Sequence, residues 1–215
     1  MKKPRVLMAD DHSLILAGLR KLVEGDCDVV GTVEDGRALV EAAQKLRPDL
    51  ILLDISMPLL NGLEAARQLR TLVPEIKLIF LTMHASPTYA TEAFQVGASG
   101  YLLKRSAASE LSLAIRSVLQ GQHYLTPSLT KDVLDLVLKP SSGQRGKPMS
   151  MALTPRQREV LQLVAEGRGT KSIATILNVS VKTVEFHKSR IMQQLDIHTT
   201  ADLTKYAITH GITGL

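Results

Sequence analysis

The chain has 215 residues, of which 45% are hydrophobic and 22% charged, a balance typical of one or two folded domains. This composition excludes collagen-like, coiled-coil and low-complexity chains, and no apolar run approaches the roughly 20 residues that a membrane-spanning helix needs. The net charge of +5 is unevenly distributed, because residues 139–215 carry 11 Lys and Arg against 5 Asp and Glu. We therefore expect a nucleic acid or an anionic membrane surface as partner for the C-terminal third alone.

Five short apolar runs in the first half are predicted to be strands. They cover residues 5–10, 29–33, 49–54, 76–82 and 100–103. Several are apolar on both faces, as strands buried in a parallel sheet are. Between two of them, Leu39, Ala42, Ala43 and Leu46 repeat at the spacing of an amphipathic helix. Five strand–helix units in about 120 residues predict a doubly wound α/β domain.

The second half has a different pattern. Residues 139–151 are rich in Pro, Gly and Ser and predict a flexible linker. Thr154, Pro155 and Gln157 then form the start of a helix with a capping box, and Gly167 marks its end. Further helices are predicted at about 171–177, 181–195 and 200–209. A short helix, a tight turn and a longer helix indicate a helix-turn-helix.

The first residues are not expected to act as a secretion signal. Met1 to Arg5 are basic, but Asp10 and Asp11 stand where a continuous apolar stretch would be required. Cys27, the single cysteine, has no partner for an intrachain disulfide and no neighbours for a thiolate metal site. A cytoplasmic protein is therefore expected.

Carboxylates stand at the ends of two predicted strands. Asp10 and Asp11 end the first strand and Asp54 ends the third. Ligands of open parallel sheets bind beyond the carboxyl ends of the strands, and neighbouring strands lie about 4.8 Å apart, so the three side chains are expected to converge. Their mutual repulsion calls for a cation, and an all-oxygen set suits Mg²⁺.

A hydroxyl and an ammonium group end the next two strands, at Thr82 and Lys104. The site would then contain four groups that together fit phosphoryl transfer through an acyl phosphate. They are a carboxylate nucleophile, a divalent cation, a hydroxyl donor and a fixed positive charge. Each residue alone has an ordinary structural explanation. Their joint placement at four strand ends favours the phosphoryl chemistry.

These residues resemble those of the bacterial response regulators. The matching elements are the pair Asp10–Asp11, the segment 54–62, Thr82 and the segment 101–104. The resemblance covers residues 4 to about 122 and implies that Asp54 accepts a phosphoryl group from a histidine kinase. It also implies several further roles. Mg²⁺ is held by Asp10, Asp11, Asp54 and the backbone carbonyl of Ser56. The side chains of Lys104 and Thr82 contact the phosphate. Thr82 and Tyr101 act as switch residues.

The helix over 181–195 divides into two faces on a helical wheel. Val184, Ile191 and Leu195 define a buried stripe. The opposite face is suited to the major groove of DNA. It carries Lys182, Phe186, Ser189, Arg190 and Gln193.

Three residues of this helix have open interpretations. Phe186 is equally consistent with a core position and a groove contact. Glu185 either accepts from a cytosine amino group or faces solvent, and Lys188 must extend from beside the buried stripe to reach a phosphate. Thr170 and Lys171 begin the preceding helix, whose N-terminal amides suit a phosphate.

The segments 153–161, 171–177 and 180–188 resemble the LuxR-type helix-turn-helix, over about 150–212. Thr183 lies within this motif and joins the candidate DNA contacts. The two halves together resemble the NarL/FixJ type of response regulator, which implies a transcription factor that dimerises on activation and binds paired half-sites in promoter DNA. In that family the last helix commonly pairs the DNA-binding domains.

We therefore predict a receiver domain over 1–124, a helical extension and linker over 125–152, and a LuxR-type DNA-binding domain over 153–215. The receiver is expected to be flavodoxin-like, with five parallel strands in the order 2-1-3-4-5, and the second domain to be a small four-helix unit.

The leading hypothesis is a phosphorylation-dependent transcriptional regulator of a two-component system, with at most slow self-phosphorylation and autodephosphorylation. A rival is a Mg²⁺-dependent phosphatase or phosphotransferase for small molecules, with an aspartate nucleophile. Ser56 stands where such an enzyme normally has its general acid, and no cap domain is available. A third possibility is an interaction protein whose basic helices bind another protein.

Overall fold

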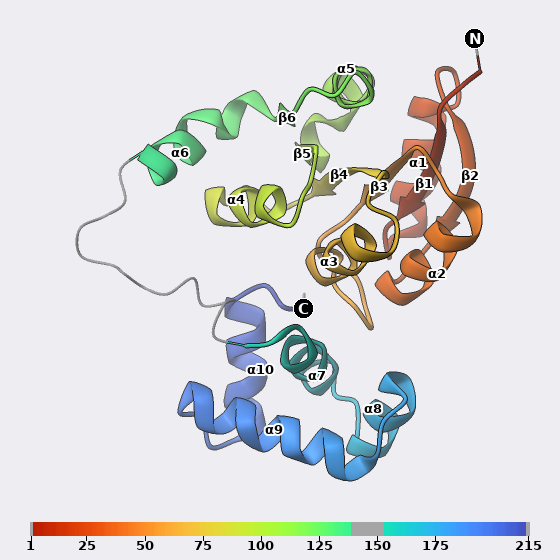
Figure 1. The fold of residues 1–215 in the computed structure, drawn as a ribbon. Coiled ribbons are helices and arrows are strands. Elements are labelled where there is room, and N and C mark those ends of the chain that lie inside the picture. Colours follow the sequence, from red (N-terminus) through yellow and green to blue (C-terminus); the bar gives the residue numbers. More distant parts are fainter. Residues whose placement is uncertain (1, 139–152, 214–215) are drawn as a thin grey trace.

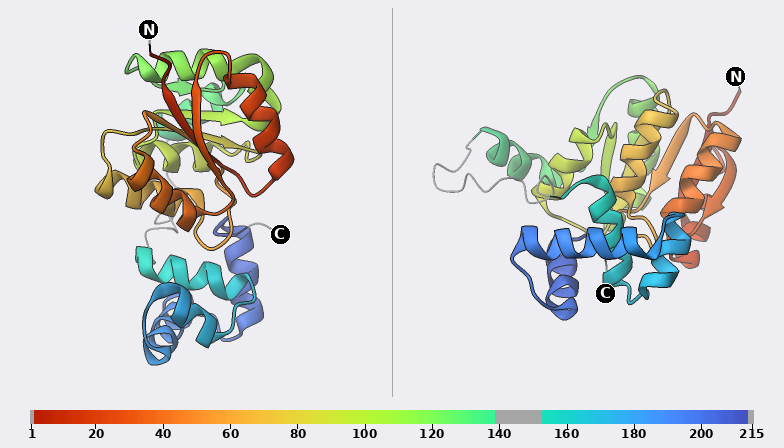
Figure 2. Two further views of the ribbon diagram at one scale, coloured as in Figure 1. Left: turned by 90° about the vertical axis from the view of Figure 1, so that its right-hand side faces the viewer. Right: turned by 60° about the horizontal axis from the view of Figure 1, so that its bottom comes forward.

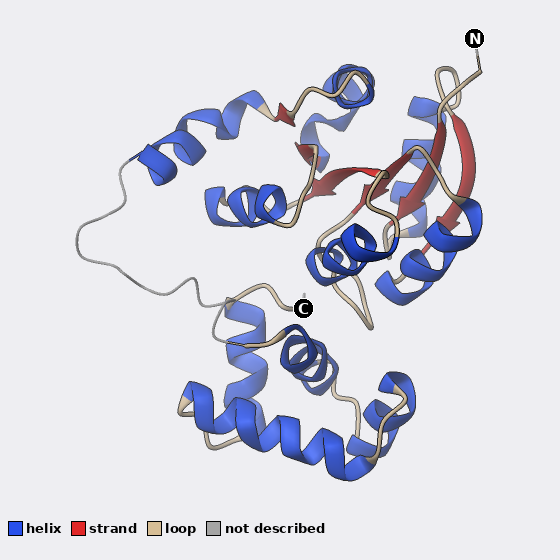
Figure 3. Ribbon diagram, viewed as in Figure 1, coloured by secondary structure: helices blue, strands red, loops and turns tan. Residues whose placement is uncertain are grey.

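The computed structural model describes residues 2–138 and 153–213. A parallel sheet with helices on both faces forms the first part, and the second part is helical (Figure 1, Figure 3). The predicted linker over 139–151 lies outside the described residues. Within the described ranges, no helix combines the length and the apolar character needed to cross a membrane.

The sheet has six parallel strands in the order β2-β1-β3-β4-β5-β6. They are β1 (Arg5–Ala9), β2 (Asp28–Val33), β3 (Leu50–Leu53), β4 (Lys77–Thr82), β5 (Gly100–Leu103) and β6 (Tyr124–Leu125). The doubly wound fold and the order of the first five strands are confirmed, but the prediction of five strands was wrong by one. Strand β6 has two residues, which pair with Gly100 and Tyr101 at the edge. Two residues are too few to give a periodic pattern in the sequence.

Helices cover both faces of the sheet (Figure 1, Figure 2). They are α1 (Ser13–Val23), α2 (Gly36–Leu46), α3 (Gly62–Leu72), α4 (Pro87–Gln95), α5 (Ala107–Leu119) and α6 (Pro127–Leu138), with a short 3-10 turn at Lys104–Ser106. Val6 and Met8 of β1 pack in the core under α1 and α5, whereas Leu7 and Ala9 pack in the core under α2, α3 and α4. Alternate residues therefore serve two cores, which explains why the strands are apolar throughout.

Helix α3 begins against the end of β3, and this start depends on a glycine. The Gly62 amide donates to Ile55 O at 2.8 Å, and a Cβ at Gly62 would lie 2.0 Å from the carbonyl oxygen of Asp54. The Asn61 side chain caps the helix by accepting a hydrogen bond from the Glu64 amide at 2.9 Å. The loop 55–61 is thereby fixed at both ends beside the acidic edge of the sheet.

The C-terminal helices are α7 (Pro155–Ala165), α8 (Thr170–Leu177), α9 (Val181–Leu195) and α10 (Thr200–Thr209). They follow the predicted ranges closely. The predicted capping box is present, because Thr154 accepts from the Gln157 amide while the Gln157 side chain accepts from the Thr154 amide. Helix α7 is the central helix of this unit and is buried on all sides from Gln157 to Val164. A helix buried all round in so small a unit must have a second packing partner.

The close approach at Gly62 can be tested by adding one methyl group. We expect Gly62→Ala to lower the free energy of unfolding by about 1–3 kcal/mol, because the new Cβ overlaps backbone atoms that have no room to move. Urea denaturation measures the change. The matched control is Gly18→Ala in α1, where a Cβ meets nothing within 4 Å and where helix propensity predicts a gain of up to about 1 kcal/mol. Equal effects at the two positions would contradict this account.

Candidate functional site

Three aspartates meet at the carboxyl edge of the sheet, as the sequence predicts. Asp10 follows β1 and Asp54 follows β3, and these strands are direct neighbours, with Ala9 paired to Leu53. Asp10 and Asp54 are buried, at 2% and 4% exposed, whereas Asp11 lies on the surface. Two buried carboxylates so close together need a positive partner.

Lys104 supplies that positive charge. Its ammonium nitrogen lies 2.7 Å from Asp10 Oδ2 and 2.8 Å from Asp54 Oδ2, and its side chain is only 6% exposed. Burial favours the neutral amine, but the hydrogen bonds and charges of the two aspartates outweigh it and raise the pKa of Lys104 above its ordinary value. Lys104 is therefore a fixed cation inside the site.

Asp54 itself is held in one orientation. Its Oδ1 accepts a hydrogen bond from the Ile55 amide at 2.7 Å, and its Oδ2 accepts from Lys104. Burial raises the pKa of Asp54 above its ordinary value, although the hydrogen bond and charge of Lys104 act in the opposite direction. The Asp54 carboxylate is therefore held in one orientation, and its negative charge lowers the stability of the folded state. A carboxylate of this kind is suited to act as a nucleophile.

Thr82 and Tyr101 stand on the other side of Asp54, at the end of β4 and on β5. Both are fully buried. The Thr82 hydroxyl accepts from the His84 amide at 3.2 Å, and the Tyr101 hydroxyl donates to the His84 carbonyl at 2.7 Å. The two predicted switch residues thus hold the same short segment after β4, with the tyrosine ring turned inward.

Two histidines were not singled out by the sequence reasoning. His12 Nδ1 lies 2.8 Å from Asp11 Oδ1 and 3.2 Å from Asp10 Oδ1, and His84 Nε2 lies 2.9 Å from the Ser56 hydroxyl. The Ser56–His84 contact joins the loop after β3 to the loop after β4. A signal was present in the sequence, because both histidines come within two residues of a strand-end site residue.

The acidic edge fits a hard divalent cation. Asp10, Asp11 and His12 each offer a ligand atom, and these atoms lie within 4.8 Å of one another. The Asp54 carboxylate, which shares the Lys104 ammonium with Asp10, lies beside them, and carboxylate oxygens are ligands that Mg²⁺ prefers. Ser56, the proposed carbonyl ligand, is partly buried beside Asp54.

Helix α9 has the two predicted faces. Val184 and Ile191 are buried in the C-terminal core, and Leu195 packs against it. The exposed residues of the opposite side are Lys182, Glu185, Phe186, Ser189, Arg190 and Gln193. Phe186 is 58% exposed, and the Arg190 guanidinium carbon lies 5.8 Å from the centre of its ring. The core interpretation of Phe186 is therefore wrong, and the aromatic ring belongs to the polar face.

The remaining candidate DNA contacts lie around this face. Lys188 is half-buried, and its ammonium donates to the Thr200 hydroxyl at 3.0 Å. The Thr183 hydroxyl bonds to that of Ser180 at 2.8 Å at the start of α9. Thr170 and Lys171 begin α8, where Lys171 is exposed.

Comparison with known proteins extends over both halves. Residues 6–116 match the family described as response regulator receiver domain, and residues 151–207 match the bacterial regulatory proteins of the luxR family. The transcriptional regulatory protein MctR of Rhizobium johnstonii is 35% identical over 212 residues, which cover 98% of this chain and 95% of that protein. The oxygen regulatory protein NreC of Staphylococcus epidermidis is 38% identical, with 95% of this chain and 96% of that protein covered.

Solved structures with a similar fold also extend over both halves of the chain. The RcsB response regulator of Salmonella typhimurium superposes with a TM-score of 0.65 at 29% identity, covering 98% of this chain and 99% of that one. RcsB bound to a promoter in the presence of a phosphomimetic gives a TM-score of 0.64 at 30% identity, covering 97% and 100%.

The raised pKa of Asp54 makes a prediction about stability. The folded state disfavours the ionised carboxylate, so Asp54 lowers stability at a pH above its folded pKa, and this penalty disappears as the pH falls below the unfolded value. Asp54→Asn removes the penalty. We expect a larger free energy of unfolding than in the parent protein at about pH 7 in metal-free buffer, and little difference between the two proteins at about pH 4.

Urea denaturation at the two pH values measures this effect. Asp28→Asn, at an exposed position, is the matched control and should show no pH-dependent gain. A gain at position 54 that is the same at both pH values would contradict the burial argument.

Proposed function

Because the chain belongs to the response regulators of the NarL/FixJ type, we propose that Asp54 is the residue whose phosphorylation controls its transcriptional activity. The observation that carries this assignment is the buried Asp54 carboxylate, oriented by Lys104 and Ile55 next to Asp10 at the carboxyl edge of the sheet. A histidine kinase is the proposed phosphoryl donor, since the receiver domain is the part of the chain that such a kinase phosphorylates.

The proposed reaction uses the residues as they stand. A carboxylate oxygen of Asp54 forms a bond to phosphorus while the bond between phosphorus and the donor atom breaks and the donor leaves with its electron pair. Lys104 neutralises charge on the phosphoryl oxygens, and the Thr82 hydroxyl turns from the His84 amide to donate to one of them. Water later attacks phosphorus, which releases inorganic phosphate and restores the carboxylate.

We propose that Asp10, Asp11, Asp54 and the Ser56 carbonyl hold Mg²⁺ during this reaction. The support is that ligand atoms of Asp10 and Asp11 lie within 4.8 Å of one another and that Asp54 shares the Lys104 ammonium with Asp10. When bound, the ion supplies neutralisation of the phosphoryl oxygens and of the carboxylates around them.

The proposed domains are a receiver over 1–124, a helical extension and linker over 125–152, and a DNA-binding domain over 153–215. The two family matches lie almost entirely within the first and third of these ranges. Helix α6 occupies the extension as far as Leu138. A cytoplasmic location accompanies this proposal, because promoter DNA is the target.

The proposed DNA-reading surface is the exposed side of α9 together with the start of α8. Its support is the exposed cations Lys182 and Arg190 beside Phe186, with Lys171 nearby. The RcsB structures include dimers bound to DNA. We propose likewise that a phosphorylated homodimer of this chain binds paired half-sites in promoter DNA.

The relatives weigh against the enzymatic alternative. MctR and NreC are regulatory proteins, and each aligns with this chain over nearly its whole length. We therefore propose that, apart from phosphoryl transfer from the kinase, Asp54 undergoes only slow self-phosphorylation from small donors and slow hydrolysis.

The phosphoacceptor is tested by labelling with a small phosphodonor such as acetyl phosphate in the presence of Mg²⁺. We expect the parent protein to gain one phosphoryl group by intact-mass spectrometry and Asp54→Asn to gain none, because the amide is not a nucleophile of this kind. Phosphodonor-dependent DNA binding should vanish with it. Asp28→Asn is the control and should label like the parent; persistent labelling of Asp54→Asn would refute the assignment.

The DNA surface is tested by removing one cation. We expect Arg190→Ala to weaken duplex binding. If Arg190 contacts a phosphate, the slope of the logarithm of the binding constant against the logarithm of the salt concentration should fall in magnitude by about 1. If it reads a base, the base preference at one position of the site should relax. Lys45→Ala, an exposed cation of α2, is the control and should change neither. Fluorescence anisotropy over a salt series measures both quantities. Unchanged binding by Arg190→Ala would contradict the assignment of this face.

A further inference from the structure

One aromatic side chain stands at the centre of the exposed face of α9. Phe186 is 58% exposed, whereas the other two phenylalanines, Phe80 and Phe94, pack in the receiver core. At 100° per residue, Phe186 lies roughly opposite Val184 and Ile191, which are buried. The folding of the C-terminal unit therefore does not account for the apolar surface of this ring.

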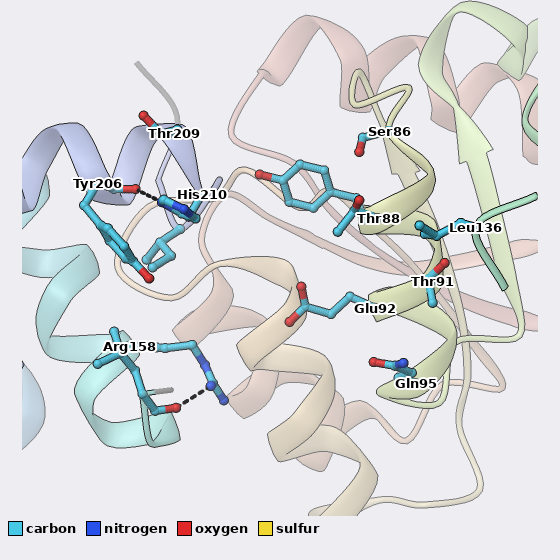
Figure 4. A pocket seen from close by; sticks show the side chains of 13 residues that line it. Ser86, Thr88, Thr91, Glu92, Gln95, Leu136, Arg158, Tyr206, Thr209 and His210 are labelled. Carbon is cyan, nitrogen blue, oxygen red and sulfur yellow. Dashed lines mark hydrogen bonds between the residues drawn. The ribbon is translucent and has the colours of Figure 1, made fainter. Parts of the chain in front are cut away.

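The receiver does not cover the ring either. It contacts the C-terminal unit through α7, where the Gln162 amide nitrogen donates to the Met57 carbonyl at 2.9 Å. A cavity of about 420 Å³ lies beside this contact, with Glu92 of α4 on one wall and Arg158 of α7 on the other (Figure 4). Helix α9 lies on the side of the C-terminal unit that is turned away from the sheet (Figure 1, Figure 2). Phe186 is thus accessible to a partner in this arrangement.

The ring also contacts a neighbouring cation. Arg190 follows Phe186 by about one helical turn, and its guanidinium carbon lies 5.8 Å from the centre of the ring. The ring of His187 meets Phe186 edge-on, with 5.7 Å between the ring centres. A guanidinium group above an aromatic face keeps the N–H groups at its edge free to donate. The ring therefore restricts where these donors point without using them.

The surroundings of the ring indicate what it packs on. Lys182, Ser189 and Gln193 are exposed on the same face, so Phe186 is a single apolar group among polar and cationic ones. A protein partner would normally present a wider apolar surface to such a contact. In the major groove of DNA, the one apolar group on the base edges is the C5-methyl group of thymine. An isolated ring on a cationic face matches that target.

We propose that Phe186 packs on the methyl group of a thymine in each half-site and positions Arg190 to bond to the O6 and N7 atoms of a guanine. This inference rests on the proposed DNA-binding function of α9. Residues four positions apart are separated by about 6 Å along a helix, and stacked base pairs by about 3.4 Å. The half-site therefore contains a thymine and a guanine about two base pairs apart.

The two contacts predict changes of different size. Removing one methyl group that is buried against a ring should weaken binding by about fourfold. Removing an acceptor from a bidentate arginine–guanine contact should weaken it by up to roughly 5- to 150-fold. Since the ring carries no charge, substitutions of Phe186 should leave the salt dependence of binding unchanged.

The methyl contact is tested with modified DNA. Duplexes that bind the full chain in the presence of acetyl phosphate and Mg²⁺ are selected from a random library. Each thymine of one half-site is then replaced in turn by deoxyuridine, which removes only the methyl group, and affinity is measured by fluorescence anisotropy at fixed salt. The parent protein should lose about fourfold at one thymine. Phe186→Ala should bind more weakly and lose nothing further from that replacement, because coupled groups are not additive.

A second variant separates the two roles of the ring. Phe186→Leu keeps an apolar side chain but has no aromatic face for the guanidinium group. It should still prefer thymine to deoxyuridine, but it should lose discrimination against 7-deazaguanine, which lacks the N7 acceptor. Arg190→Ala should lose that discrimination as well. Lys45→Ala, at an exposed position of α2, is the control and should match the parent on every duplex.

The outcomes distinguish this inference from the function on which it rests. If Phe186→Ala loses affinity by the same factor on thymine and deoxyuridine duplexes, the ring contacts protein or holds the fold, and the inference is wrong. Selected half-sites without a thymine and a guanine at the stated spacing would also overturn it. In both cases DNA binding by α9 stands. A parent protein that selects no duplex at all would overturn the proposed function together with this inference.

Discussion

The contact between Lys104 and the paired carboxylates Asp10 and Asp54 is the interaction on which the rest of this structure depends. Two aspartates with almost no solvent exposure are tolerable only beside a buried cation, and Lys104 lies within 2.8 Å of both. The doubly wound fold makes this possible, because parallel strands bring their carboxyl ends to one edge. The fold thus holds a charged carboxylate in one orientation, at a site where it is less well solvated than it would be in water.

The loops at the same edge also contact the C-terminal helices. The segments after β3 and β4 form the walls of the acidic site, and they also carry the contacts to the C-terminal helices, through Met57 and Asn61 on one side and Tyr89 on the other. Around a cavity of about 420 Å³, these hydrogen bonds are joined by the buried Arg158–Glu64 ion pair and by Leu59, which packs against the C-terminal core.

Much of the fold and of the acidic site could be predicted from the sequence, because both depend on patterns of neighbouring residues. Strand ends place Asp10, Asp54, Thr82 and Lys104, and hydrophobic spacing with a cap places the C-terminal helices. The edge strand β6 was missed because two residues carry no period. The Ser56–His84 contact was missed because nothing local links a serine and a histidine 28 residues apart.

The junction between the units could not be predicted for a related reason. Polar residues of α7 such as Arg158 and Gln162 have the composition of a solvent-exposed face, and only the tertiary structure shows that this face is buried against residues about 100 positions earlier. Phe186 presents the opposite case, an aromatic residue that composition assigns to a core and the structure places on the surface.

The direct test of the whole account is to treat the protein with acetyl phosphate and Mg²⁺, reduce it with borohydride and map the peptides by mass spectrometry. Reduction converts an aspartyl phosphate to homoserine, and the account predicts homoserine at position 54 alone; its recovery at position 10 or 11, with Asp54 intact, would contradict it.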